Sequence, residues 1–206
     1  MLHGLSVASG KALGAYPGLA IVAHDNRLVP AGRVPRYLDL AAYRDAAGVP
    51  YTQSSNLLAA LDVALDVDWQ TRWRGVLDAD TRLRAQLRQL GFAIVANDRV
   101  AQPGVISLAL ASAVPALRLA ARMERSGFRL ACRSNYLARR NWLQICLMGE
   151  WEPAALEILP VVLARHATAC AAAAAAHGPA CKAAGGVRAQ GYAVVEDGPG
   201  QYVRQR

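Results

Sequence analysis

The first third of the chain alternates short apolar runs with polar stretches. Residues 19–23 form a short apolar run that predicts a buried strand. The polar, proline-containing stretch 24–35 predicts a surface loop. Residues 37–47 predict a short helix, which the glycine and the proline that closely follow bring to an end.

Two longer helices are predicted next. Ser54 is a good N-cap residue before a set of leucines that share one helical face, namely Leu57, Leu58, Leu61 and Leu65. A second helix carries Leu83, Leu87 and Leu90 at spacings of four and three, and Gly91 ends it.

After residue 91 the spacing of the apolar residues changes, and short runs typical of strands alternate with helical stretches, as in a compact α/β unit. The predicted strands are residues 92–96, 105–110, 128–132 and 142–148. The predicted helices are residues 114–125 and a final helix from about residue 152, which the alanine tract 171–176 could extend. The expected organisation is therefore a first segment over 1–90, a small α/β domain over 91–177 and a flexible tail over 178–206.

Composition places this pattern in a globular protein. Apolar residues make up 54% of the 206 residues and charged residues 18%, which excludes the disordered and fibrous classes. The net charge of +8 raises the question of nucleic acid. The arginines are scattered among acidic residues and do not interleave with aromatic residues, so we expect no nucleic-acid partner.

Cysteines and apolar stretches exclude three further classes. The four cysteines form no CxxC pair and have no histidine at zinc-ligand spacing, so no metal site is expected. Cys132 and Cys146 lie in strand-like runs, which favours small buried side chains in a reducing cytoplasm. Prolines and charges interrupt the apolar stretches 105–121 and 154–176, and the first ten residues lack a signal-peptide pattern. We therefore expect neither a membrane span nor secretion.

Lys11 is the strongest candidate for chemistry. Only Lys11 and Lys182 are lysines among 23 cationic residues, so 21 are arginines. Lys11 lies between small, flexible residues, which leave room for a bulky aldehyde beside its amine. Arginine cannot replace lysine in such a role, because the guanidinium stays protonated. The alternative is an ordinary surface lysine in a glycine-rich loop.

The run S-G-K-A-L-G-A-Y-P-G, residues 9–18, resembles the cofactor-lysine segment of class V aminotransferases. These fold-type-I enzymes depend on pyridoxal 5'-phosphate and include alanine-glyoxylate and 2-aminoethylphosphonate aminotransferases. The resemblance implies that Lys11 is the catalytic residue, which holds the cofactor as a Schiff base and moves a proton between substrate carbon and cofactor.

A second run, P-Y-T-Q-S-S-N-L-L over residues 50–58, is similar to the segment before the long interdomain helix of that family. The resemblance implies that Tyr51 and Ser54 contact the cofactor phosphate of the neighbouring subunit. A hydroxyl at a helix N-terminus is suited to binding a phosphate. Plain N-capping by Ser54 is the alternative, and the two roles are compatible.

A third run, N-W-L-Q-I-C-L-M-G over residues 141–149, is similar to the small-domain strand that carries the substrate-carboxylate arginine. Gln144 stands where that arginine is expected, which favours a donor with a different anionic group, such as an aminophosphonate. Arg139 and Arg140 lie just upstream, and Arg140 could bind a substrate anion from another angle. Their alternative role is that of solvated loop residues.

The resemblance covers about residues 5–163 and implies a fold class. The chain is expected to be α/β, the C-terminal portion of a fold-type-I PLP-dependent transferase: the end of the large domain, the long interdomain helix and the small α/β domain. Since Lys11 lies ten residues from Met1, we expect the remaining half to be supplied by a separate polypeptide or to be lost.

The implied function is transamination from an amino acid or aminophosphonate to a 2-oxo acid, in a cytoplasmic homodimer or with a complementing N-terminal half. The alternative is a non-catalytic truncated relative that acts as a binding or assembly module. A class V desulfurase or lyase is disfavoured, because its reactive cysteine belongs on a loop, whereas Cys132 and Cys146 lie in strand-like runs.

Overall fold

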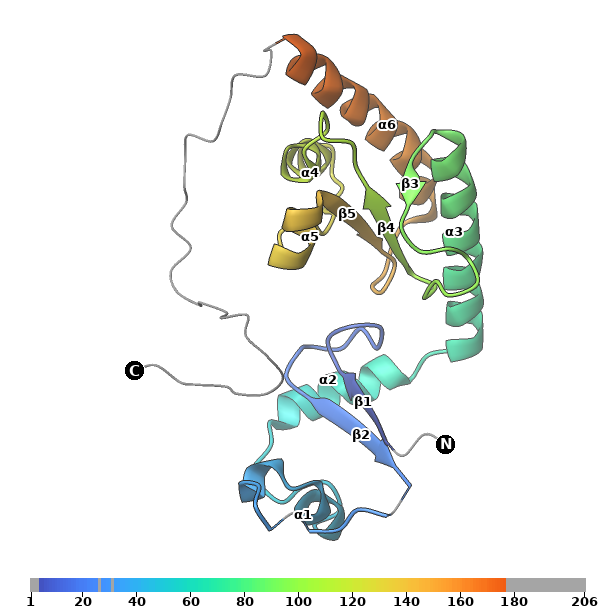
Figure 1. Cartoon of the computed structure of the whole chain (residues 1–206). Coiled ribbons are helices and arrows are strands. Elements are labelled where there is room, and N and C mark those ends of the chain that lie inside the picture. Colours follow the sequence, from blue (N-terminus) through green and yellow to red (C-terminus); the bar gives the residue numbers. More distant parts are fainter. Residues whose placement is uncertain (1–3, 26, 31, 177–206) are drawn as a thin grey trace.

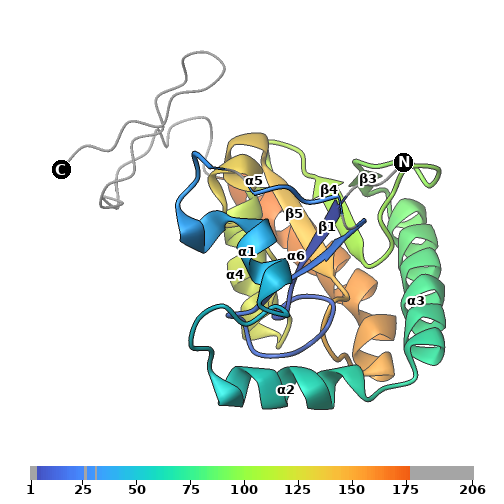
Figure 2. The same ribbon diagram turned by 90° about the horizontal axis from the view of Figure 1, so that it is seen from below.

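Two antiparallel sheets organise the residues that the computed structural model describes, which are 4–25, 27–30 and 32–176 (Figures 1 and 2). The first unit contains β1 (Gly4–Ala8), β2 (Ala20–His24), a 3-10 turn (Arg36–Leu38), α1 (Leu40–Asp45) and α2 (Ser55–Leu65). The second contains α3 (Trp69–Gln89), β3 (Ala93–Ile94), β4 (Val105–Ala109), α4 (Ala116–Arg125), α5 (Asn135–Arg140), β5 (Trp142–Cys146) and α6 (Pro153–Ala176). The predicted tail over 178–206 lies outside the described residues.

β1 and β2 form an isolated hairpin, paired from Gly4 opposite His24 to Ala8 opposite Ala20. The strand predicted over 19–23 is confirmed as β2, but its predicted burial is wrong. Leu5 is 50% exposed and Val22 38% exposed, because a two-stranded sheet leaves most of its surface to solvent where no further layer covers it. β1 was not predicted, since its sequence GLSVA contains a glycine and a serine and no continuous apolar run.

The helix predicted over 37–47 is interrupted at Asp39. The Asp39 carboxylate accepts a hydrogen bond from the Ala41 amide and N-caps α1, so the preceding turn stays separate from it. α1 ends as predicted just before a glycine, with Ala47 at a φ of 50° and Gly48 at 85°.

The second sheet has the order β3-β4-β5, and its register separates a buried face from an open face. Ile106 lies opposite Ile145 and Leu108 opposite Leu143, and all four side chains are buried. Ser107 lies opposite Gln144 on the other face and both are only half-buried. This alternation confirms the strands predicted around 105–110 and 142–148.

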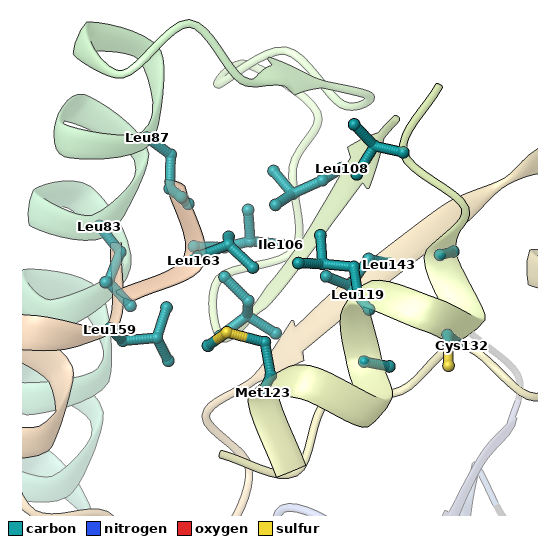
Figure 3. Close-up of a cluster of buried hydrophobic side chains, with 14 of the residues drawn as sticks. Leu83, Leu87, Ile106, Leu108, Leu119, Met123, Cys132, Leu143, Leu159 and Leu163 are labelled. Atoms are coloured by element: carbon teal, nitrogen blue, oxygen red, sulfur yellow. The ribbon is translucent and has the colours of Figure 1, made fainter. Parts of the chain in front are cut away.

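Helices α3, α4 and α6 cover the buried face and complete the core (Figures 1 and 3). The helical core residues include Leu83 and Leu87 of α3, Leu119 and Met123 of α4, and Leu159 and Leu163 of α6. Both α3 leucines were expected on one face, whereas the third, Leu90, lies beyond the helix and is exposed. α3 thus packs on the second sheet although it precedes residue 91.

The strand predicted over 128–132 does not form. A single bridge joins Ala131 to Gln144, with hydrogen bonds in both directions at 2.8 and 3.0 Å. The flanking Arg129 and Arg133 turn to solvent and pair with Glu124, so the segment crosses β5 at one residue only. The unpredicted helix α5 follows and begins at Ser134, whose hydroxyl accepts from the Leu137 amide.

α6 follows the prediction from residue 152 and includes the alanine tract. Its length of 24 residues and its apolar composition are sufficient to cross a membrane. The same helix buries Leu159, Leu163 and Cys170 in the core of the second unit. The absence of a membrane span therefore remains an expectation from the sequence.

A buried ion pair joins α3 to the sheet. The Arg84 Nε donates to the Asp80 carboxylate at 2.6 Å, and its Nη2 donates to the Val105 carbonyl at 3.1 Å. The other Asp80 oxygen accepts from the Gly104 amide at 3.1 Å. Arg84 is 3% exposed and Asp80 6%, so each charge depends on these partners for its solvation.

We expect Arg84→Met to destabilise the protein by about 3–5 kcal/mol, because it leaves the Asp80 carboxylate buried without its cation. Arg82→Met, at an exposed position of the same helix, is the matched control and should change stability by less than about 0.5 kcal/mol. Urea unfolding followed by circular dichroism measures both. Equal midpoints for the two variants would contradict the importance of the pair.

Candidate functional site

The turn that carries Lys11 is closed by Ser9. The Ser9 amide donates to the Leu19 carbonyl at 3.0 Å and continues the β1–β2 ladder by one pair. Its hydroxyl donates to the Tyr16 carbonyl at 2.7 Å and accepts from the Leu19 amide at 3.2 Å. Ser9 is fully buried beneath the turn. One small side chain thus fixes both ends of the ten-residue segment.

Glycines allow the turn to fold back on itself. A Cβ at Gly10 would lie 2.7 Å from the Pro17 Cβ, so only glycine fits there. Gly14 has a φ of 77°, and its amide donates to the Lys11 carbonyl at 2.9 Å. The small residues around Lys11 were interpreted from the sequence as leaving room for a bulky aldehyde. They also allow the turn to close.

Lys11 is exposed at the tip of this turn. Among the residues that the structure describes, its amine has neither an ion-pair partner nor a hydrogen-bond partner. Figure 1 shows that the chain between β1 and β2 projects toward the connection between β5 and α6. An amine in this position is free to react with an aldehyde.

Cys146, at the end of β5, lies within electrostatic reach of Lys11. Packing around the thiol raises the pKa of Cys146, and the Lys11 ammonium lowers it in part by favouring the thiolate. The expectation that both Cys132 and Cys146 are buried is correct for Cys132 and wrong for Cys146, which is exposed. Cys146 takes the last position of β5 on the open face, where the sheet ends.

Arg72, in the first turns of α3, contacts the same region and was not identified from the sequence. Its guanidinium lies against Gly14, whose added Cβ would be 3.3 Å from Nη2. The same nitrogen donates to the Met148 carbonyl at 3.5 Å, and the guanidinium lies 5.2 Å from the Trp69 ring centroid. These side chains border a cavity of about 140 Å³ that also contacts Ala12. No motif marked Arg72, because its role depends on folding.

Gln144 lies on the open face of β5, two residues before Cys146. Its Nε2 donates to the Ser107 hydroxyl at 2.8 Å. Gln144 also borders a wider cavity of about 710 Å³ formed with residues 129–134. It is therefore on the same strand face as Cys146, but its side chain is held toward β4.

Arg140 lies at the other end of β5. Its guanidinium stacks 3.9 Å from the Tyr136 ring centroid and lies 5.6 Å from that of Trp142. Four residues of strand, about 13 Å, separate Trp142 from Cys146. Arg139 and Arg140 belong to the last turn of α5 rather than to a loop. A substrate role for Arg140 stays a prediction.

Tyr51 and Ser54 precede α2. The Tyr51 ring packs 5.2 Å from that of Tyr37 and 6.0 Å from that of Tyr43, measured between centroids. Ser54 takes the N-cap position of α2, but its hydroxyl makes no capping hydrogen bond. The hydroxyl therefore remains available for another acceptor or donor, and contact with a phosphate stays a prediction.

The part of the chain that the structure describes contains no group of three histidine, cysteine, aspartate or glutamate side chains placed to hold a metal ion. The fold instead brings Lys11, Arg72 and Cys146 together near the end of β5. Gln144 lies next to them along β5.

Comparisons with known proteins identify the fold. No family model matches the sequence, and no curated protein matches it. Among solved structures, an aspartate aminotransferase of subgroup IV from Thermus thermophilus matches with a TM-score of 0.68 and 22% identity, over 82% of this chain and 50% of that one. Ureidoglycine-glyoxylate aminotransferase from Bacillus subtilis matches with a TM-score of 0.68 and 18% identity, over 85% and 51%.

Alanine-glyoxylate aminotransferase from Nostoc sp. matches with a TM-score of 0.65 and 20% identity, over 80% of this chain and 48% of that one. A serine palmitoyltransferase that contains PLP as an internal aldimine matches with a TM-score of 0.59 and 14% identity. The chain spans about half the length of the first three structures. The expected fold, that of the C-terminal portion of a fold-type-I aminotransferase, is confirmed.

We expect Gly10→Ala to loosen the lysine turn, because the new Cβ would overlap Pro17. A cost of about 1–3 kcal/mol would speed amide hydrogen exchange at Ser9 and Leu19 by about one to two orders of magnitude. Gly75→Ala, inside α3 with open space around it, is the control and should leave exchange in the turn unchanged. Unaltered exchange in Gly10→Ala would refute the packing argument.

Proposed function

We propose that this chain is the C-terminal half of a class V aminotransferase that transfers an amino group from an amino acid or aminophosphonate to a 2-oxo acid. The observation that carries the proposal is the unpaired amine of Lys11 on a turn closed by Ser9 and spaced by glycines. The turn lies in a fold shared with half of several aminotransferases.

The residues present fit pyridoxal 5'-phosphate in two respects. The Lys11 amine is exposed and has no competing partner among the described residues, so it is available to hold the cofactor covalently. The Ser54 hydroxyl is not engaged in capping and lies at the N-terminus of α2, where partial positive charge favours a phosphate. When bound, the cofactor withdraws electrons from the substrate carbon that bears the amino group.

Lys11 has a second role in the proposed reaction. With pyridoxal 5'-phosphate bound, the Lys11 Nζ would be the group that takes up the proton from the substrate carbon and returns it. Arginine cannot perform either step, since its guanidinium stays protonated.

The substrate is expected to meet the open face of β5. Gln144 offers neutral hydrogen-bonding groups there and no positive charge. Arg140, in the last turn of α5 just before β5, is the proposed contact for a substrate anion. Its aromatic neighbours hold the guanidinium in one orientation.

The hairpin of β1 and β2 indicates a partner. Because Ser9 and Leu19 form a hydrogen-bonded pair, alternation along the ladder turns the amides of Ser6 and Ala8 away from β2. β1 has no charge and no proline, the usual features of a protected edge. We infer that a complementing N-terminal half of the fold, or a second copy of the chain, covers this edge in a cytoplasmic assembly.

The same bare hairpin favours a second candidate function. A truncated relative without catalysis could use this surface as a binding or assembly module. The two functions differ in whether Lys11 reacts with the cofactor. They are therefore separated by one labelling experiment.

We expect Lys11, and not Lys182, to be labelled when the full chain is incubated with pyridoxal 5'-phosphate and reduced with borohydride. Peptide mass spectrometry identifies the labelled residue, and Lys11→Ala should lose the label while remaining folded. Labelling of both lysines to the same extent would indicate a nonspecific amine reaction. No label on Lys11, alone or with a complementing half added, would favour the binding module.

Ser54→Ala should weaken cofactor affinity by about 1–2 kcal/mol, which corresponds to roughly 5- to 30-fold in Kd, through loss of a charge-assisted hydrogen bond. Ser55→Ala, at the next position of the same helix start, is the matched control and should bind like the parent. Titration of the cofactor followed by its absorbance measures both. If the two variants bind alike, Ser54 does not contact the phosphate.

A further inference from the structure

Arg72 stands between the two units of the chain. It belongs to α3, which is anchored in the second core by Leu83, Leu87 and the Asp80–Arg84 pair. Its guanidinium nevertheless reaches the turn of the first unit at Gly14 and the chain after β5 at Met148. One side chain therefore contacts three segments that are far apart in sequence.

Arg72 also lacks the partner that an arginine usually has. Within the described ranges, no carboxylate lies within ion-pair distance of its guanidinium, although the side chain is half-buried. Its neighbours are instead a carbonyl oxygen, the Trp69 ring and the space beside Gly14 that a Cβ would fill. A planar guanidinium suits such a place, because it packs flat against a glycine and a ring while it donates at its edge.

We propose that Arg72 is a positioning residue that holds the Lys11 turn against the end of β5. Gly14 is three residues from Lys11 and bonds to its carbonyl, and Met148 is two residues from Cys146. Fixing Gly14 and Met148 on one guanidinium therefore fixes the distance between the Lys11 amine and the open end of β5. The role of this placement in catalysis rests on the proposed function, whereas the contacts of Arg72 are independent of it.

Gly14 belongs to the same contact, because its missing side chain leaves room for the Arg72 guanidinium. With a Cβ at this position the guanidinium would be 3.3 Å away, and the φ of 77° disfavours any other residue. Gly14→Ala thus crowds Arg72 without removing its charge, and it also strains the turn. It provides a second variant that retains the Arg72 charge.

The test uses the Cys146 thiol as a gauge of the Lys11 position. Since the Lys11 ammonium lowers the pKa of Cys146, moving the amine away should raise that pKa and slow alkylation. Iodoacetamide alkylation of the full chain, without cofactor, is followed at pH 8.5 by mass spectrometry of the Cys146 peptide. We expect Lys11→Met to slow the reaction about threefold, because loss of the ammonium raises the pKa of the thiol and leaves less thiolate.

Arg72→Met and Gly14→Ala should slow alkylation to a similar extent in the parent and should have no further effect in the Lys11→Met background. Arg74→Met, on the same helix but with its contact to Gln70, is the control and should react like the parent. Arg72→Lys should restore part of the rate. Thermal unfolding of each variant verifies that it is folded, and Gly14→Ala gives a second readout if Arg72→Met is not.

Two outcomes would overturn the proposal. If Arg72→Met slows alkylation equally with and without Lys11, Arg72 acts on the thiol directly rather than through the lysine. If Arg72→Met and Gly14→Ala both react like the parent, the guanidinium does not place the turn. Because no cofactor is present, failure of Lys11 to take the cofactor label leaves this result intact and refutes the proposed function alone.

Discussion

The placement of everything else depends on how α3 is fixed. Its C-terminal part is held in the second core by two leucines and by a buried ion pair whose remaining groups bond to the backbone beside β4. A buried pair contributes little net stability, since desolvation offsets its attraction, but its geometric requirements are strict. The helix thus has one orientation on the sheet, and its first turns, with Arg72, extend toward the lysine turn.

The candidate site is consequently shared between two units, and each unit contributes a different part of it. The second unit supplies a rigid strand, β5, whose inner face belongs to the core and whose outer face carries Gln144 and Cys146. The first unit supplies the Lys11 amine on a turn whose closure depends on one buried serine. The arrangement combines a strand fixed in the core with an exposed amine on a neighbouring turn.

The sequence was most informative where one pattern has one structural solution. Alternation along β4 and β5, the leucine spacing of α3 and the start of α6 all predicted their elements, because burial on a single face leaves few options. The segment 128–132 has the alternation of a strand because Phe128, Leu130 and Cys132 pack on the core, but it pairs with β5 at Ala131 only. Lys11 could be proposed from its neighbours in the sequence, whereas Arg72 could not, since its partners lie at residues 14 and 148 and only the fold brings them together.

The open hairpin of β1 and β2 also sets the order in which parts of the molecule come apart. Free energies of local opening follow the apolar contacts that a segment buries, so the hairpin opens more readily than the sheet of β3, β4 and β5. Lys11 therefore lies on the less stable of the two sheets, whereas β5 belongs to the more stable one. Any chain that pairs with the free edge of β1 would suppress this opening and, at the same time, order the turn that carries Lys11.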